Sequence, residues 1–287
     1  MADGPLRIEP LPASFGATVT GARLATLDDG VFARIYAAWL EFGLLICPAQ
    51  YLTREQQVAV ARRFGPIEFA GIPISNVRDD GRLRDPDDAW VRVLKGNQGW
   101  HIDSTYVPVQ SRGALLSAQV TPAEGGETEW ADMAAAYDAL TPDMQVRVST
   151  LSAFHSMKRS QAVTGDDYRP GADHGGYGAD AAPPLRPLVK THPETGRQSL
   201  VVGRHAYGVP GLDAAESERL LAGLVDMACR PPRVWRHAWR PGDVAIWDNR
   251  RTMHRGLPWD LSRPRVLHHT RLAGDPITEF APSPSPS

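Results

Sequence analysis

Cysteine is scarce in this sequence: its 287 residues include only Cys47 and Cys229. Two cysteines are too few for a disulfide framework or for a thiolate zinc site. Long apolar runs are missing too, since no stretch approaches the roughly 20 residues that a membrane-spanning helix needs. The amino terminus, MADGPLRIEP, lacks the basic-then-apolar order of a signal peptide. These absences predict a cytoplasmic protein with reduced thiols.

An excess of charge of one sign is also missing. The chain has 31 Lys and Arg against 33 Asp and Glu, which gives a formal net charge of −2. This balance provides no electrostatic reason to expect a nucleic acid or an anionic membrane as partner. Hydrophobic residues make up 42% of the chain, enough for a sizeable core. We therefore expect a single domain over residues 1–280 and a disordered tail at 281–287, APSPSPS.

Two helices are predicted in the amino-terminal part of the chain. Residues 28–43 have acidic residues at their start and Gly43 at their end. Residues 52–65 contain a capping-box pattern, in which Thr53 caps the helix and Gln56 completes the box. A short buried strand, LLICPA, separates the two helices.

The rest of the chain predicts a mainly β fold with flanking helices. Residues 66–96 are expected to be irregular. Two helical stretches are expected, one at 132–148 with Asp132 as its cap and one at 213–228. The insertion at about 155–184 is rich in Gly, Ala and Asp and is expected to form a lid. From residue 100 onward, Gly and Pro turns separate short strands, which favours a barrel or sandwich over a parallel βαβ sheet. These strands are GALLSAQVT, GGETEWA, PLVKTH, QSLVV, RVWRHAW, DVAIWD and RVLHHTRLAG.

A His-x-Asp pair occurs in GNQGWHIDSTY, residues 96–106. On an extended strand the side chains of His101 and Asp103 would project from the same face. Such a pair alone is more often a turn or a surface hydrogen bond than a metal site. A third donor is available in His254, which ends PGDVAIWDNRRTMH, an apolar strand that leads into a polar bend. Together these residues offer two imidazoles and one carboxylate.

This donor set is compatible with two metals. Non-haem Fe(II) accepts it and keeps three positions open for substrate and oxygen, whereas zinc accepts it and uses a bound water for hydrolysis. An iron oxygenase of this type also needs a 2-oxo acid as a source of electrons. Arg265, in RPRVLHHTRLAGD, is a suitable bidentate partner for the far carboxylate of such an acid, and Thr128 can add a hydroxyl.

Five segments in order resemble the TauD/TfdA family of Fe(II)- and 2-oxoglutarate-dependent dioxygenases. They are WHIDSTY, TPAEGGETEWADMAAAYDAL, PLVKTHPETGRQSL, WRPGDVAIWDNRRTMHRG and RVLHHTRLAGD. The resemblance implies a double-stranded β-helix, or jelly roll, with helices outside and a lid over the mouth. It implies that His101, Asp103 and His254 are the iron ligands and that Thr128 and Arg265 bind 2-oxoglutarate. It also implies O2 as cosubstrate, ascorbate as a help in vitro, and a homo-oligomer, either dimer or tetramer.

The reaction implied by the resemblance is oxidative decarboxylation of 2-oxoglutarate to succinate and CO2, coupled to hydroxylation of an unactivated C–H bond. Where the hydroxylated carbon bears a heteroatom, the C–O, C–N or C–S bond is then cleaved. Related halogenases lack the metal-binding carboxylate that Asp103 supplies here. Hydroxylation of a small organic substrate is therefore the expected outcome.

The resemblance is less informative about the substrate. In taurine- and phenoxyacetate-type members a second arginine, a few residues beyond the cosubstrate arginine, binds the acidic group of the substrate. Here His269 stands four residues after Arg265, so taurine is not expected. Strand alternation would place Arg265, His269 and Arg271 on one face if no bulge intervenes. The stretch VGRHAYGVPGL resembles the aryloxyalkanoate branch, in which Arg204 is a further candidate contact. The other candidate substrate residues are Asn97, His205, Tyr207, Trp247 and His269.

Three alternatives stay open from the sequence. One keeps the chemistry and changes the substrate to an amino-acid derivative or a biosynthetic intermediate. Another is a zinc hydrolase with the same donors, and the last is a non-catalytic β-barrel binding protein.

Overall fold

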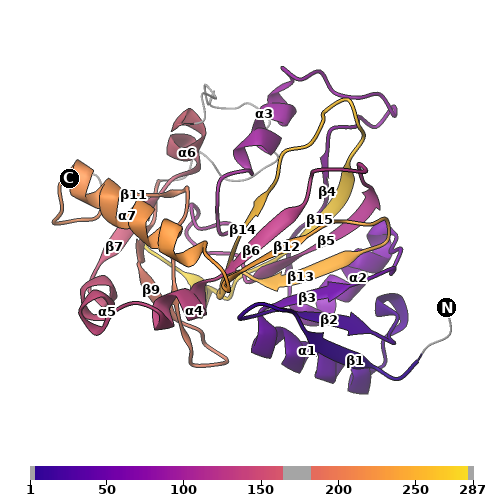
Figure 1. Cartoon of the computed structure of the whole chain (residues 1–287), viewed down its shortest axis with the longest axis horizontal. Coiled ribbons are helices and arrows are strands. Elements are labelled where there is room, and N and C mark those ends of the chain that lie inside the picture. The colour runs from indigo at the N-terminus through magenta and orange to yellow at the C-terminus, as the bar shows by residue number, and fades with distance from the viewer. Residues whose placement is uncertain (1–3, 164–181, 284–287) are drawn as a thin grey trace.

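The computed structural model describes residues 4–163 and 182–283 (Figure 1). The described chain is mainly β, and its helices lie outside the sheets. The strands are β1 (Arg7–Pro10), β2 (Ala17–Thr20), β3 (Leu44–Cys47), β4 (Ile67–Ser75), β5 (Gly113–Val120), β6 (Thr128–Asp132), β7 (Ser152–His155), β8 (Leu185–Pro187), β9 (Val189–Thr191), β10 (Gln198–Leu200), β11 (Ala206–Tyr207), β12 (Val234–His237), β13 (Val244–Asp248), β14 (Thr252–Gly256) and β15 (Val266–Leu272). The helices are α1 (Asp29–Phe42), α2 (Arg54–Phe64), α3 (Ala89–Gly96), α4 (Met133–Asp138), α5 (Pro142–Ser149), α6 (Met157–Val163), α7 (Ala214–Ala228) and α8 (Pro276–Glu279), with a 3-10 turn at Leu24–Thr26.

Two sheets form the centre of the fold. The larger has seven strands in the order β1-β2-β3-β13-β5-β15-β4, and the smaller has three in the order β12-β6-β14. The pairs are antiparallel except for β2 with β3. Strands from distant parts of the sequence are neighbours, as expected for a jelly roll rather than a meander. Smaller sheets, β10-β9 and β11-β7-β8, complete the described strands.

Side-chain alternation along β13 separates two layers of core. Val244 and Ile246 belong to the cluster that packs against α1 and α2 on the outer face of the large sheet. Ala245 and Trp247 point the other way and join the cluster that contains Trp130 of β6. Because successive side chains of a strand face opposite sides, one apolar run fills both layers. Figure 1 shows α1 and α2 together at one end, with α5, α6 and α7 at the other.

The predicted amino-terminal helices are confirmed with their caps. The Asp28 side chain accepts a hydrogen bond from the backbone of Val31 at the start of α1, and Gly43 ends the helix with a φ of 71°. Thr53 and Gln56 form the predicted capping box of α2. The buried strand between them is β3.

The expectation of an irregular segment at 66–96 is wrong. Residues 67–75 form β4, which pairs with β15 at the edge of the large sheet. Pro73 is tolerated there because an edge strand leaves some of its backbone N–H groups without partners. Helix α3 follows, capped by Asp88, whose side chain accepts from the backbone N–H of Trp90. The charged run before α3 hid this cap among other acidic residues.

The helical stretch at 132–148 is two helices rather than one. Asp132 caps α4 as predicted, but Thr141 caps a second helix, α5, which begins at Pro142. Proline has no backbone N–H to donate and is favoured in the first turn, so it starts a helix here instead of continuing one. The stretch at 213–228 is confirmed as α7, with Asp213 as its cap. Most of the predicted lid, residues 164–181, and residues 284–287 of the tail lie outside the described residues.

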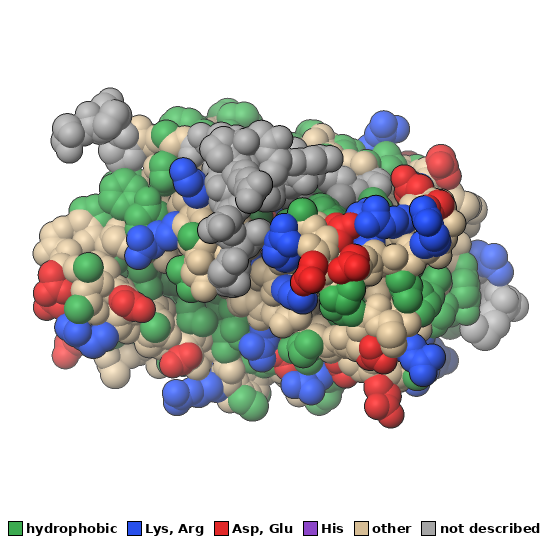
Figure 2. Space-filling model, turned by 90° about the horizontal axis from the view of Figure 1, so that it is seen from above, with side chains coloured by type: hydrophobic (Ala, Val, Ile, Leu, Met, Phe, Trp, Pro, Cys, Tyr) green, Lys and Arg blue, Asp and Glu red, His purple; other side chains and the backbone are tan. Residues whose placement is uncertain are grey.

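None of the helices described is both long and apolar enough to cross a membrane. Figure 2 shows basic and acidic side chains interspersed among the coloured residues of one face. The described part of that face therefore presents no continuous basic surface of the kind that binds nucleic acid.

Candidate metal centre

The two histidines of the predicted triad are joined through their backbones. His101 and His254 form an isolated β-bridge, in which each backbone N–H donates to the other's carbonyl, at 2.9 and 2.8 Å. Their ring centroids are 4.3 Å apart. Residues 101–103 do not form the extended strand that the spacing suggested, because Asp103 begins a turn in which Ser104 has a φ of 54°. The turn nevertheless brings the Asp103 carboxylate to the two imidazoles.

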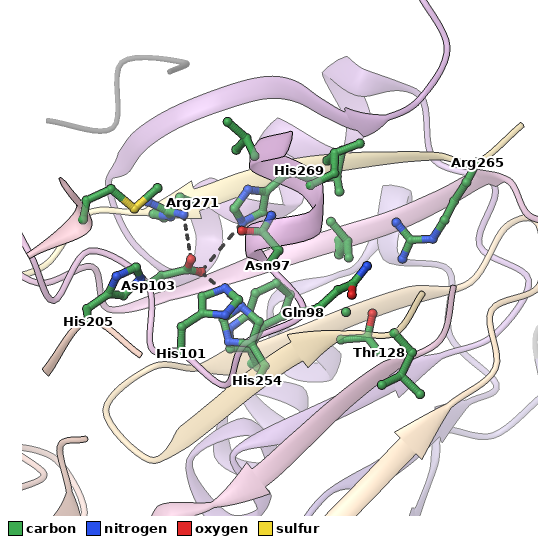
Figure 3. A pocket seen from close by; sticks show the side chains of 18 of the residues that line it. Asn97, Gln98, His101, Asp103, Thr128, His205, His254, Arg265, His269 and Arg271 are labelled. Atoms are coloured by element: carbon green, nitrogen blue, oxygen red, sulfur yellow. Dashed lines mark hydrogen bonds and ion pairs between the residues drawn. The ribbon is translucent and has the colours of Figure 1, made fainter. Parts of the chain in front are cut away.

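The donor atoms of His101, Asp103 and His254 converge on one point. One ligand atom from each lies within 4.8 Å of the others, and all three side chains are buried. His254 Nε2 is 3.8 Å from Asp103 Oδ2, a contact drawn as a dashed line in Figure 3. Asp103 Oδ2 is buried without a hydrogen-bond partner among the described residues. A buried carboxylate oxygen that faces imidazole nitrogens and lacks a donor is typical of a site for a divalent cation.

The ring orientation of His101 is fixed by a neighbouring carbonyl. His101 Nδ1 lies 2.8 Å from the Gly99 carbonyl oxygen, which can only accept, so Nδ1 carries the proton. The lone pair of Nε2 is therefore available for a metal, as in many histidine ligands that donate their other N–H to a backbone carbonyl.

The charge states of the triad suit a metal. Burial, aided by the neighbouring His254, lowers the pKa of His101 to about 3. Burial also lowers the pKa of His254, so both rings are neutral at physiological pH. Burial acts to raise the pKa of Asp103, but Arg271 and the surrounding histidines outweigh it and hold that pKa well below its usual range. The site therefore presents two neutral imidazoles and an ionised carboxylate, the forms that bind metals.

Arg271 fixes the second oxygen of Asp103, a role that the sequence analysis missed. Its Nη2 lies 2.6 Å from Asp103 Oδ1, and its Nη1 donates to Ser104 Oγ at 3.0 Å. Ser104 in turn donates to Glu68 of β4 at 3.0 Å. No local sequence pattern indicated this pairing, because it depends on β15 lying next to the turn that begins at Asp103.

Thr128 and Arg265 lie together on one side of the triad, and His205 lies on the other (Figure 3). The Arg265 Nε donates to the Gly126 carbonyl at 3.0 Å, and the indole of Trp259 lies 5.0 Å from the guanidinium carbon. Among the described residues its two terminal nitrogens have no hydrogen-bond partner. Burial lowers the pKa of Arg265 to about 10, which still leaves it charged at neutral pH. A buried cation with two free donors is a suitable site for a carboxylate.

Four of the six candidate substrate residues line the same pocket as the triad. They are Asn97, His205, Trp247 and His269. The His205 Nδ1 is 2.8 Å from Ser160 Oγ, which leaves its Nε2 on the pocket side. His269 stacks on Trp247 at 6.0 Å between ring centroids. Its ring nitrogens have no hydrogen-bond partner among the described residues, and its Nε2 lies 3.9 Å from Asp103 Oδ2.

Two candidate substrate contacts, Tyr207 and Arg204, are absent from the pocket lining. Tyr207 does not line the pocket: its ring packs against Phe154 and under the guanidinium of Arg159. Arg204 points away from the pocket because its guanidinium donates to the Gly96 carbonyl and, at 2.5 Å, to Gln161 Oε1. These bonds tie α3 and α6 to the loop before β11.

β15 contains register shifts, but they do not remove the predicted alignment. The shifts fall between Val266 and Leu267 relative to β5, and after His269 relative to β4. Arg265, His269 and Arg271 all line the pocket nevertheless. Further lining residues that the sequence analysis did not anticipate come mostly from α3 and from the segment after β14. They are Ile74, Val93, Leu94, Gln98, Tyr106, Leu116, Met157, Gly256, Leu257 and Trp259.

Comparison with known proteins agrees with this geometry. Residues 7–272 match the family described as "Taurine catabolism dioxygenase TauD, TfdA family". The chain is 55% identical to a (S)-phenoxypropionate/alpha-ketoglutarate-dioxygenase of Sphingobium herbicidovorans over 96% of this chain and 97% of the relative. It is 38% identical to an alpha-ketoglutarate-dependent 2,4-dichlorophenoxyacetate dioxygenase of Cupriavidus pinatubonensis, over 83% of this chain and 86% of that relative.

A solved structure is similar over the whole chain. The crystal structure of AAD-2 in complex with Mn(II) and N-oxalylglycine superposes with a TM-score of 0.88 at 32% identity, covering 99% of this chain and 100% of the other. The fold is therefore a jelly roll of the same type, mainly β with flanking helices. The chain belongs to the TauD/TfdA family and is a 2-oxoglutarate-dependent non-haem iron dioxygenase that uses Fe(II), 2-oxoglutarate and O2 on a small-molecule substrate.

Proposed function

We propose that His101, Asp103 and His254 hold the iron and that Thr128 and Arg265 hold 2-oxoglutarate beside it. The observation that carries the proposal is the unpartnered Asp103 oxygen, buried and facing neutral imidazoles. Three protein donors leave the remaining coordination positions to the cosubstrate and oxygen. With iron bound, the centre would catalyse the oxidation of 2-oxoglutarate by O2 to succinate and CO2. This oxidation would be coupled to hydroxylation of the substrate.

The protein's own residues have separate tasks in this reaction. Arg265 neutralises and orients the distal carboxylate of 2-oxoglutarate through its two free terminal nitrogens. Arg271 keeps Asp103 ionised and fixed, so that its other oxygen stays aimed at the metal. The apolar lining from α3 and Met157 excludes water from the reacting carbon.

We propose a 2-aryloxyalkanoate as the substrate. The relatives named above support this choice, and so does a pocket that combines apolar and aromatic walls with a few polar groups. Hydroxylation of the carbon that bears the aryloxy oxygen gives a hemiketal. That product collapses by breaking the C–O bond, with the proton of the new hydroxyl passing to the leaving phenolate. From 2-phenoxypropionate the products are phenol and pyruvate.

The proposed substrate contacts are Asn97, His205, Trp247 and His269. His205 lies across the triad from Arg265, so a substrate beside it is separated from the cosubstrate (Figure 3). His269 occupies the place at which related enzymes use an arginine. Burial and the neighbouring Arg271 lower the pKa of His269 to about 3, so it meets the substrate as a neutral hydrogen-bonding group.

The three alternative functions that the sequence left open are affected differently by these findings. Membership of the dioxygenase family excludes the zinc hydrolase and the non-catalytic barrel. An amino-acid derivative or a biosynthetic intermediate remains an alternative substrate. The substrate panel described next therefore includes N-substituted amino acids.

The test is a substrate panel assayed with Fe(II), 2-oxoglutarate and ascorbate. It contains both enantiomers of 2-phenoxypropionate, phenoxyacetate, taurine, an alkyl sulfate ester and N-substituted amino acids, and succinate and phenol are measured. Aryloxyalkanoates are expected to give equal amounts of succinate and phenol. Preference for any other class would contradict the substrate assignment. Separately, Asp103→Ala and His254→Ala are each expected to abolish succinate formation, and unaltered turnover in either would contradict the metal assignment.

We further propose that residues 1–280 form one domain, with the lid at about 155–184, and that the protein assembles as a homo-oligomer, a dimer or tetramer. The expectation of a disordered tail from residue 281 is wrong for its first residues, because Ala281 is buried and its backbone N–H donates to the Pro108 carbonyl at 2.8 Å. Light scattering coupled to gel filtration tests the assembly. Cys47 and Cys229 are free thiols, and together with a ferrous cofactor they favour a reducing, cytoplasmic location.

A further inference from the structure

We propose that Trp239 is a positioning residue for the cosubstrate: it directs the hydroxyl proton of Thr128 toward the distal carboxylate of 2-oxoglutarate. This inference rests on the roles proposed above for Thr128 and Arg265. Trp239 opens the family-like segment WRPGDVAIWDNRRTMHRG, but it is absent from the pocket lining and was not a candidate site residue.

One hydrogen bond joins Trp239 to Thr128. The Trp239 Nε1 donates to Thr128 Oγ1 at 2.9 Å, across 111 residues of sequence. An indole N–H can only donate, so the threonine oxygen is the acceptor in this bond. A hydroxyl has one proton, and no other side chain or carbonyl of the described residues accepts it. Thr128 lines the pocket, so its proton is left for an acceptor that enters the pocket.

The indole is held firmly in this position. Trp239 is buried, and its ring meets Trp130 at 6.2 Å and His237 at 4.8 Å between ring centroids. The His237 Nε2 is 3.1 Å from Asp243 Oδ2. β12 pairs with β6 so that His237 lies opposite Thr128. Trp239 follows β12 by two residues, so the strand pairing brings the donor close to Thr128 on β6, and the packing of the indole fixes the direction of the bond.

Two side chains of this part of the pocket are therefore set to donate. The Arg265 terminal nitrogens and the Thr128 hydroxyl lie in the same region of the pocket, with the Gln98 amide beside them (Figure 3). Without Trp239 the hydroxyl would be free to turn and accept, and this part of the pocket would lose its selectivity for an anion. The hydroxyl of Thr128 would donate to a charged carboxylate. Loss of this hydrogen bond is therefore expected to lower the affinity for the cosubstrate measurably.

The test measures the binding of N-oxalylglycine, a 2-oxoglutarate analogue with the same distal carboxylate, to the Mn(II)-loaded full chain by titration calorimetry. Trp239→Phe keeps the ring and removes the N–H, and it is expected to weaken binding about 5- to 10-fold. Thr128→Val is expected to weaken binding at least as much, and Thr128→Ser to keep most of it. In the Thr128→Val background, Trp239→Phe is expected to weaken binding no further.

The melting temperature gives an independent readout. Thr128→Val leaves the buried Trp239 N–H without an acceptor and lowers the melting temperature, whereas adding Trp239→Phe removes that unpaired donor and restores part of the loss. If Trp239 acted only through packing, its substitution would lower stability equally in both backgrounds.

Trp130→Phe is the matched control. Trp130 lies in the same aromatic cluster, but its Nε1 has no hydrogen-bond partner among the described residues. Its substitution is expected to leave the affinity for N-oxalylglycine unchanged. Equal weakening by Trp130→Phe and Trp239→Phe would overturn the inference, as would normal binding by Trp239→Phe.

Arg265→Gln separates this inference from the proposed function. It is expected to lose most of the binding of N-oxalylglycine. If Arg265→Gln binds normally, the cosubstrate assignment is wrong and the role of Trp239 falls with it. If Arg265→Gln loses binding and Trp239→Phe does not, only the inference about Trp239 is overturned.

Discussion

Arg271 and Asp103 are 168 residues apart in the sequence and form a 2.6 Å ion pair that occupies one carboxylate oxygen and leaves the other facing His254. Both side chains are buried. The pair fixes one carboxylate oxygen and leaves the other for the iron that we propose binds there. It explains how a residue in a turn, where the backbone is less restrained than in a strand, keeps its carboxylate in one orientation.

The first prediction concerns this ion pair. Arg271→Gln is expected to weaken Mn(II) affinity by about 10- to 100-fold, because Asp103 loses both its orientation and the charge that keeps its pKa low. Calorimetric titration of the metal-free protein measures the effect. Ser104→Ala serves as the milder control, because it removes the bonds of Ser104 to Arg271 and Glu68 and leaves the ion pair between Arg271 and Asp103 in place. Unchanged metal affinity with a raised KM for the substrate would instead assign Arg271 to substrate binding.

A second prediction concerns the space that Arg265 occupies. A Cβ on Gly126 would lie 2.9 Å from Arg265 Cδ and Nε, and Gly126 has a φ of 71°. Gly126→Ala is therefore expected to displace the guanidinium and raise the KM for 2-oxoglutarate about tenfold, equivalent to roughly 1.4 kcal/mol.

Gly196→Ala is the control for the backbone effect. Gly196 has a φ of 72°, but a Cβ there would meet no atom within 4 Å. Both variants carry the left-handed strain of a non-glycine residue, about 1 kcal/mol. Only Gly126→Ala is expected to change the KM for 2-oxoglutarate. An equal change in both variants would mean that displacement of Arg265 is not the cause.

The third prediction concerns substrate choice at His269. His269→Arg is expected to raise affinity for small carboxylates and sulfonates, because it adds a permanent cation where a neutral ring now stands. The measurement is kcat/KM for phenoxyacetate and for an alkylsulfonate, each compared between the variant and the unchanged enzyme. If no acid on the panel responds, His269 lies outside the substrate's reach.

The fourth prediction concerns pH and a histidine remote from the metal. His155 is buried, its ring nitrogens have no partners among the described residues, and burial together with Arg186 lowers its pKa to about 3. The unfolded chain binds a proton at pH values where folded His155 does not, so its contribution to stability is full above about pH 6.5 and is lost as the pH falls toward 3.

His155→Phe removes this pH dependence. The difference in the free energy of unfolding between pH 7 and pH 5 is expected to shrink by about 2 kcal/mol in the variant. Urea unfolding of the metal-free protein at the two pH values measures it. An unchanged difference would mean that His155 is protonated in the folded state.

Local features of the chain could be predicted where short-range chemistry decides them. The caps at Thr53 and Asp132 are as predicted, because a capping side chain bonds the backbone only two or three residues away. β4 was not predicted because it depends on an edge position beside β15, a partner distant in the sequence. α3 was not predicted although its cap is local, because Asp88 stands among other acidic residues.

The same distinction between local and long-range interactions applies to the candidate site. The residue types and their order along the chain were enough to single out His101, Asp103, His254, Thr128 and Arg265, because metal and carboxylate binding require particular donors. Their convergence, the pairing of Asp103 with Arg271, the bond from Trp239 to Thr128 and the exclusion of Tyr207 depended on the folded chain. Hydrogen bonds between residues more than a hundred positions apart leave no periodic signal, and only the packing of two sheets brings such residues together.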